Sequence, residues 1–208
     1  MEEILKEIER LKKSEVKDTV QSRMTEFRNL GKGDIDSIFS ELCFCITTAN
    51  FNAERSIRMQ GVIGKGYCDM PEAELARKLK EQGHRFPKAR ASYISNARGQ
   101  KERLKEKLGS YERERELREW VADNVKGIGL KEASHFLRNI GFRNLAIIDF
   151  HIIDLLVRYG IIERPNTLTP KRYIEIEDKL KELADRTKLN LAELDMYLWY
   201  METGKILK

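Results

Sequence analysis

Apolar residues recur every three or four positions along almost the whole chain. The N-terminal part shows the pattern most simply, with apolar side chains at Ile4, Leu5, Ile8, Leu11, Val16, Val20, Met24 and Phe27. This spacing places apolar side chains on one face of an α-helix, whereas the alternation typical of strands is scarce. The sequence therefore predicts an all-α fold, in which two helical lobes bury these faces against one another.

Glycine and proline divide this pattern into separate helices. The stretches that we expect to be helical after residue 30 are 35–50, 71–82, 88–108, 111–125, 130–139, 149–159 and two more around 173–183 and 191–201. We expect Asp34 to cap the first of these and Pro71 to lie in the first turn of the second. Residues 1–208 are expected to form a single compact unit, with a helical hairpin at about 111–140.

Charge and cysteine content narrow the possible functions only slightly. The 39 Lys and Arg residues outnumber the 34 Asp and Glu residues, and this modest basic excess suits a polyanionic partner. Cys43, Cys45 and Cys68 lack the spacing of a zinc or iron–sulfur site, and three cysteines form no disulfide framework. With no apolar run long enough for a membrane span and no signal peptide, we expect a cytoplasmic protein with no membrane partner.

A first glycine-rich stretch, Gly61 to Gly66, superficially resembles a phosphate-binding loop. No strand precedes it, and no Gly-Lys-Ser or Gly-Lys-Thr follows, so the context of a P-loop is missing. We interpret Gly61, Gly64 and Gly66 as a connection between helices.

A second glycine pair, Gly127 and Gly129, lies between two helix-like stretches. A tight turn between helices needs positive φ, which glycine adopts readily, and the missing Cβ lets a phosphate approach the backbone. The amides of Gly127 and Gly129, the dipole of the next helix and the neighbouring Lys126 would together bind a DNA phosphate without reading sequence. The alternative is that the two glycines merely join two helices.

Two residues near this turn suggest chemistry. Lys131 lies two places after Gly129, and Asp149 follows Lys131 by 18 positions. An amine that loses its proton is a nucleophile, and a fixed carboxylate stabilises positive charge that develops beside it. The ordinary alternatives are an exposed surface lysine and an aspartate that only caps a helix.

The stretch KGIGLKEASHFLRNIG, followed by IIDFH, resembles the helix-hairpin-helix DNA glycosylase superfamily. It is most similar to the type-2 8-oxoguanine DNA glycosylase/AP lyases, and the likeness runs from about Glu41 to the C-terminus through ELCFCITTANF, GHRFPKARASYISNAR and WYMETGKILK. The resemblance implies that Lys131 is the nucleophile. It also implies that Asp149 stabilises the charge on the deoxyribose.

The resemblance further implies how the damaged base is bound. The nucleotide must leave the base stack to expose C1′, and Phe86 and Trp199 are expected to sandwich the flipped base. The terminal carboxylate of Lys208 is expected to accept the N7–H that 8-oxoguanine has and guanine lacks. The alternatives are core packing for the two aromatic residues and a frayed tail for Lys208. Some of the basic residues near Phe86 are expected to contact phosphates: Arg85, Lys88, Arg90 and Arg98.

These expectations describe a bifunctional enzyme that acts as a monomer on double-stranded DNA, associated with the nucleoid. It would excise 8-oxoguanine opposite any base, cytosine most often, through a lysine imine and then cleave 3′ to the abasic site by β-elimination. No metal or cofactor is expected. No cysteine follows Cys68, which excludes the C-terminal iron–sulfur cluster of endonuclease-III-like relatives. The alternatives are another oxidised base as substrate, a non-catalytic DNA-binding module, or a purely structural helical protein.

Overall fold

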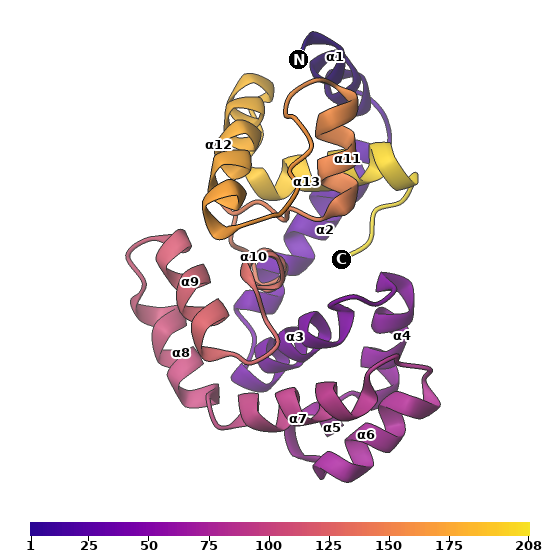
Figure 1. The fold of residues 1–208 in the computed structure, drawn as a ribbon, viewed down its shortest axis with the longest axis vertical. Coiled ribbons are helices and arrows are strands. Elements are labelled where there is room, and N and C mark those ends of the chain that lie inside the picture. Colours follow the sequence, from indigo (N-terminus) through magenta and orange to yellow (C-terminus); the bar gives the residue numbers. More distant parts are fainter.

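The computed structural model describes all 208 residues and contains thirteen helices and no strand, which confirms the all-α prediction (Figure 1). The helices are α1 (Glu2–Leu11), α2 (Val16–Gly31), α3 (Ile35–Thr48), α4 (Ala53–Ile63), α5 (Gly66–Asp69), α6 (Glu72–Glu81), α7 (Pro87–Arg98), α8 (Lys101–Ser110), α9 (Glu114–Asn124), α10 (Leu130–Asn139), α11 (Phe150–Arg158), α12 (Pro170–Thr187) and α13 (Leu191–Thr203). None of them is long and apolar enough to cross a membrane.

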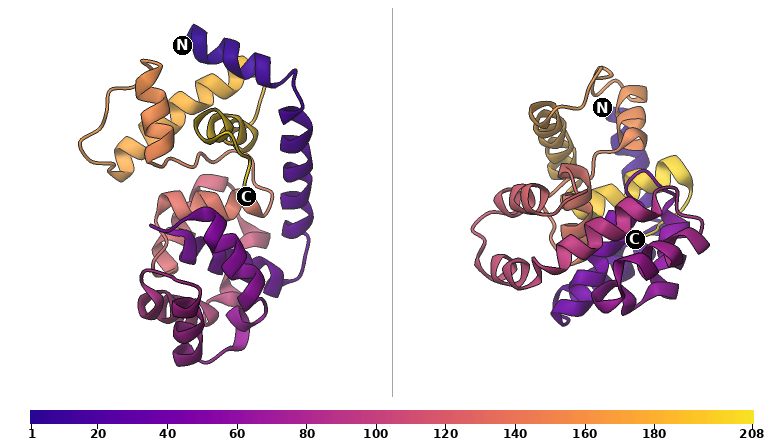
Figure 2. Two further views of the ribbon diagram at one scale, coloured as in Figure 1. Left: turned by 90° about the vertical axis from the view of Figure 1, so that its right-hand side faces the viewer. Right: turned by 60° about the horizontal axis from the view of Figure 1, so that its bottom comes forward.

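The buried apolar residues divide between two lobes. The larger cluster has 25 residues, contributed by α3 to α10, the turns between them and two residues that follow α10, Ile140 and Leu145. The second has 16 residues and joins α1, α11 with the connection before it, α12 and α13. Helix α2 runs alongside both lobes, packing on α13 at one end and near α10 at the other (Figure 2). Helix α10 therefore lies where the lobes meet.

Several helices begin at a side chain that satisfies a free backbone amide. Asp34 accepts a hydrogen bond from the Ser37 amide at 2.7 Å, which confirms the predicted cap of α3. Asp149 caps α11 in the same way by accepting from the Ile152 amide at 3.0 Å. Such caps fix where a helix starts and stabilise it by about 1 kcal/mol each.

Three predicted boundaries were wrong. The expected helix 88–108 is two helices, because the chain turns at Gly99 and Gln100, where the amides bond three residues back rather than four. Arg98 stabilises this break by donating to the Tyr67 and Gly66 carbonyls. Gly109 lies inside α8 rather than in a break, and the next helix starts at residue 114 instead of 111.

The first glycine-rich stretch also differs from the prediction. Gly61 belongs to α4, a helix that the sequence pattern did not reveal, and Gly66 begins the short α5. Only Gly64 makes the turn, with a φ of 52°. Pro71 is the residue before α6 rather than a member of its first turn.

Candidate active site

The hairpin turn joins α9 to α10 through Gly127 and Gly129. Gly127 has a φ of 86°, and a Cβ there would stand 2.3 Å from Cδ2 of Tyr93, so both conformation and space require glycine. Ile128 is buried between the two glycines, which are exposed. Lys126 is exposed, with its ammonium 5.6 Å from the centre of the Tyr93 ring.

The amide of Gly129 already has a partner. It donates to Oε2 of Glu132 at 3.4 Å, so this carboxylate occupies one of the directions in which a phosphate would bind. The opening of α10 nevertheless keeps the positive end of the helix dipole at the surface. A phosphate bound here would have to share the turn with Glu132.

Lys131 lies in the first turn of α10, immediately after this turn. Its side chain is 30% exposed, and its ammonium forms an ion pair with Oε1 of Glu132 at 2.9 Å. The lysine is thus partly sheltered and held by one carboxylate.

Helix α10 presents His135 and Arg138 on the same face as Lys131, because they follow it by four and seven residues. The His135 ring packs edge-on against Phe44, and its Nε2 is buried without a hydrogen-bond partner. Burial, with the positive charges of Arg138 and Lys131, holds the pKa of His135 well below its usual value, although the Lys208 backbone opposes this shift. His135 is therefore neutral at pH 7.

Asp149 caps α11 in the second lobe, and α13 of the same lobe carries Asp195. Arg138 donates to Asp195 of α13 at 2.9 Å. Burial raises the pKa of Asp195, Arg138 lowers it, and the nearby Asp149 carboxylate raises it further. The predicted amine lies in the first turn of α10 and the predicted carboxylate at the start of α11, and no hydrogen bond or ion pair joins the two side chains.

The two aromatic residues expected to sandwich the base come from different lobes. Phe86 precedes α7 in the predicted helix break and is 43% exposed, with the Arg85 guanidinium 5.1 Å from its ring centre. Trp199 is partly buried on α13, its Nε1 has no hydrogen-bond partner, and His151 meets its ring edge-on at 5.0 Å. No aromatic contact joins Phe86 to Trp199.

The C-terminal residue is docked rather than frayed. The ammonium of Lys208 donates to Glu41 at 2.7 Å and to Oε1 of Gln60, and it lies 4.4 Å from the centre of the Phe44 ring. Glu41 is 2% exposed and also accepts from Asn139 of α10 at 2.6 Å. The tail thus returns to the first lobe and ends beside α10.

Two of the four basic residues near Phe86 are already committed to the fold. Arg90 is buried and donates to the Ala49 carbonyl at 2.6 Å. Arg98 donates to the Gly66 and Tyr67 carbonyls of α5, as described above. Arg85 and Lys88 are exposed. Only the last two are therefore open to a phosphate.

Four polar residues around this region were not singled out from the sequence: His135, Arg138, Asp195 and Glu41. The sequence could have indicated the first two, because they follow Lys131 by four and seven residues and so lie on the same face of the helix. Nothing in the sequence indicated Asp195 or Glu41, because both lie in strongly apolar helices far along the chain from α10. Their partners became evident only in three dimensions.

The fold and this turn define a helix-hairpin-helix protein with a lysine at the start of the second hairpin helix. The family described as 8-oxoguanine DNA glycosylase matches residues 20–189. A protein of Korarchaeum cryptofilum named 8-oxoguanine DNA glycosylase/AP lyase is 49% identical, covering 100% of this chain and 99% of its own. The chain therefore belongs to the 8-oxoguanine DNA glycosylase family.

Solved structures agree with this assignment. The Methanocaldococcus jannaschii 8-oxoguanine glycosylase/lyase, in complex with a 15mer DNA containing 8-oxoguanine, has a TM-score of 0.95 and 48% identity and covers 99% of each chain. The 8-oxoguanine DNA glycosylase of Thermotoga maritima has a TM-score of 0.93 and 44% identity, covering 100% of this chain and 99% of its own.

Proposed function

We propose that this chain is a bifunctional DNA repair enzyme that excises 8-oxoguanine from double-stranded DNA and then cleaves the strand 3′ to the abasic site. The observation that carries the proposal is the match, over the whole length of the chain, to proteins named 8-oxoguanine DNA glycosylase/AP lyase. Residues 1–208 act as one unit and as a monomer, in keeping with relatives that match the whole length of the chain.

Lys131 is the nucleophile. Its amine, once unprotonated and free of Glu132, attacks C1′ of the flipped nucleotide and displaces the base with the electron pair of the glycosidic bond. The base leaves with a proton, the sugar ring opens, and nitrogen and C1′ form an imine. Removal of a proton from C2′ then expels the 3′ phosphate by β-elimination. These displacement, imine-forming and elimination steps need no external oxidant or reductant, so the reaction calls for no redox cofactor.

Asp149 stabilises the positive charge that develops on the deoxyribose as the base leaves. Its capping bond to the Ile152 amide holds the carboxylate still, which favours electrostatic stabilisation because no reorganisation is needed during the reaction. The same residue thus serves the fold and the chemistry.

The flipped base binds between Phe86 of the first lobe and Trp199 of the second. The two rings do not contact each other in the free enzyme, and stacking a base on such rings contributes about 1–3 kcal/mol per base. The terminal carboxylate of Lys208 accepts the N7–H of 8-oxoguanine, and the docking of its ammonium on Glu41 supports this role. Guanine offers a lone pair at N7 and would be repelled.

The hairpin positions the duplex through its phosphates. Gly127 and Gly129 bring the backbone close to the strand, and Lys126 contributes a positive charge that is exposed at the turn. Contacts of this kind set register without reading sequence.

Borohydride reduction tests the proposal, because it converts an imine into a stable covalent protein–DNA adduct. We expect an adduct on a duplex with one 8-oxoguanine opposite cytosine, and none on the matched duplex with guanine. A protein that binds the lesion duplex but neither releases the base nor forms an adduct would be a non-catalytic binding module. An adduct that forms better on a duplex with an oxidised pyrimidine would show that this lesion is the preferred substrate.

A further inference from the structure

Asp149 stands at the end of a connection, residues 143–149, that contains no helix of its own. Leu145, Ala146, Ile147 and Ile148 are all buried. Buried amides and carbonyls need hydrogen-bond partners, and this segment has no regular structure to supply them. The side chains that do so also determine where Asp149 lies.

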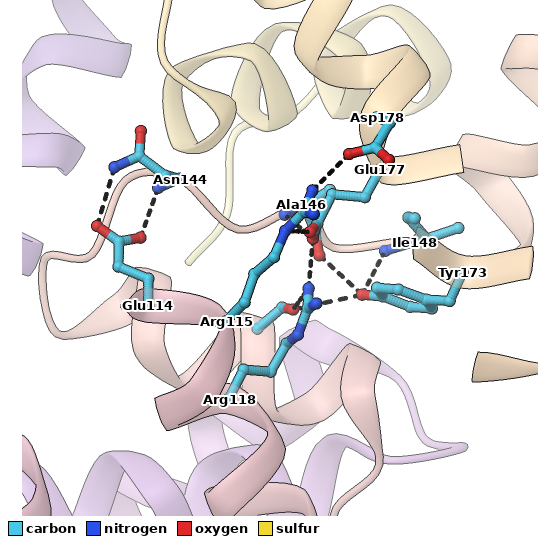
Figure 3. Close-up of polar contacts among 10 residues, drawn as sticks. Glu114, Arg115, Arg118, Asn144, Ala146, Ile148, Tyr173, Glu177 and Asp178 are labelled. Atoms are coloured by element: carbon cyan, nitrogen blue, oxygen red, sulfur yellow. Dashed lines mark hydrogen bonds and ion pairs between the residues drawn. The ribbon is translucent and has the colours of Figure 1, made fainter. Parts of the chain in front are cut away.

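One of these side chains is Tyr173 of α12 (Figure 3). Its hydroxyl donates to the Ala146 carbonyl at 2.7 Å and accepts from the Ile148 amide at 3.3 Å. The same oxygen lies 3.4 Å from Oγ of Ser134, which is three residues after Lys131 on α10. A single hydroxyl thus touches the residue before Asp149 and the helix that carries Lys131.

The hydroxyl is well suited to hold these groups in place. Tyr173 is 3% exposed, and burial raises its pKa, so the group stays protonated and keeps its donor. Loss of the hydroxyl would leave the Ala146 carbonyl and the Ile148 amide unsatisfied in the interior, which is more costly than losing an exposed hydrogen bond.

Glu177, one helical turn after Tyr173, holds the other side of the segment. It accepts from the Ala146 amide at 3.1 Å and is itself paired with two residues of α9, Arg115 at 2.7 Å and Arg118. Glu177 and Arg118 are both fully buried. Such a pair adds little net stability, but breaking it is costly, so it favours one arrangement of the groups around it.

We infer that Tyr173, supported by Glu177, is a positioning residue that fixes Asp149 relative to Lys131. The inference rests on the proposed function, in which these two residues carry the chemistry. The capping bond of Asp149 ties it to α11 alone. The Tyr173 hydroxyl ties the preceding backbone to α10, so it controls the separation on which the reaction depends.

The substitution Tyr173→Phe tests this inference, because it removes the hydroxyl and keeps the ring. In single-turnover assays on an 8-oxoguanine duplex, we expect base excision and borohydride trapping to slow by about 10- to 100-fold, as displacements near 1 Å do. Duplex affinity should stay within about twofold, because no phosphate contact is touched. Tyr197→Phe is the matched control, since Tyr197 is equally buried in the cluster between α2 and α13 and should retain the wild-type rate.

A double-mutant cycle separates positioning from general loosening. If Tyr173 acts through Asp149, Asp149→Asn with Tyr173→Phe should be no slower than Asp149→Asn alone, whereas independent effects would multiply. Ser134→Ala provides a milder second variant in case Tyr173→Phe fails to fold, and it should slow excision while leaving duplex affinity intact.

Different results would overturn different claims. Wild-type excision rates in Tyr173→Phe and Ser134→Ala, or multiplying effects in the double mutant, would refute the positioning role. The proposed function would still hold in that case, provided that the wild-type protein forms the adduct. Absence of an adduct with the wild-type protein would instead refute the proposed function itself.

Discussion

Two turns in this chain share the pattern glycine–any residue–glycine, and their comparison shows what makes one of them a candidate site. Gly64 and Gly127 both have positive φ, at 52° and 86°. The turn at Gly64 leads into α5, a helix of four residues, and a Cβ at Gly64 would meet nothing within 4 Å. The turn at Gly127 packs against Tyr93 and leads into the ten-residue α10 between the lobes.

The difference shows that a glycine–any residue–glycine turn does not by itself make a candidate active site. Helix α10 is longer than α5, so the positive end of its dipole is stronger. It also carries Lys131, His135 and Arg138 on one face. The lysine of the first turn, Lys65, is exposed, whereas Lys131 is partly buried and paired with Glu132. Four pairs of matched substitutions probe this comparison, three of them between the two turns and one between two helix caps.

The largest effect is expected for Lys131→Gln compared with Lys65→Gln. Removing the nucleophile should abolish the borohydride adduct and reduce excision by at least about 10³-fold, since nucleophile deletions cost this much or more. Lys65→Gln should behave as wild type. Single-turnover excision and trapping measure both, and normal trapping by Lys131→Gln would mean that another amine forms the imine.

The two capping aspartates give the next comparison, Asp149→Asn against Asp34→Asn. Asparagine caps helices as well as aspartate, so both variants should fold with nearly wild-type thermal stability. Loss of the charge at 149 should slow excision by about 10²- to 10⁴-fold, while the same loss at 34 should not. Equal excision rates in the two variants would show that Asp149 serves only as a cap.

Gly127→Ala and Gly64→Ala compare the turns themselves. Positive φ alone should cost each variant about 1–2 kcal/mol of unfolding free energy. Gly127→Ala should lose more, because its Cβ would stand 2.3 Å from the Tyr93 ring, and it should also bind duplex DNA more weakly. Denaturant unfolding and a binding titration measure these effects. Equal losses of unfolding free energy at both turns would show that the Tyr93 ring shifts to accommodate the added methyl group.

The smallest effect is expected for Lys126→Ala compared with Lys65→Ala. If Lys126 contacts a phosphate, its removal should lower the slope of log affinity against log salt concentration by about 1. Lys65→Ala should leave the slope unchanged. Titrations of a lesion duplex at several salt concentrations provide the measurement, and an unchanged slope for Lys126→Ala would remove this residue from the interface.

Much of the helical pattern was predictable because it depends on neighbours in sequence. The Asp34 cap and the helix 130–139 follow from contacts within one or two turns, and the structure confirms them. The break at Gly99 was missed because it depends on Arg98 reaching the Tyr67 carbonyl 31 residues away. Helix α4 was missed because the glycines near its end resembled a loop.

The sequence by itself determined the all-α class, the glycine turn and the places of Lys131 and Asp149 along the chain, because helical periodicity and positive φ are local properties. Only the tertiary structure decided which groups meet. Tyr173 reaches Ser134 across 39 residues, and Lys208 reaches Glu41 across 167. Such contacts depend on how the two lobes pack around α10, and the local conformational preferences of the chain do not encode that packing.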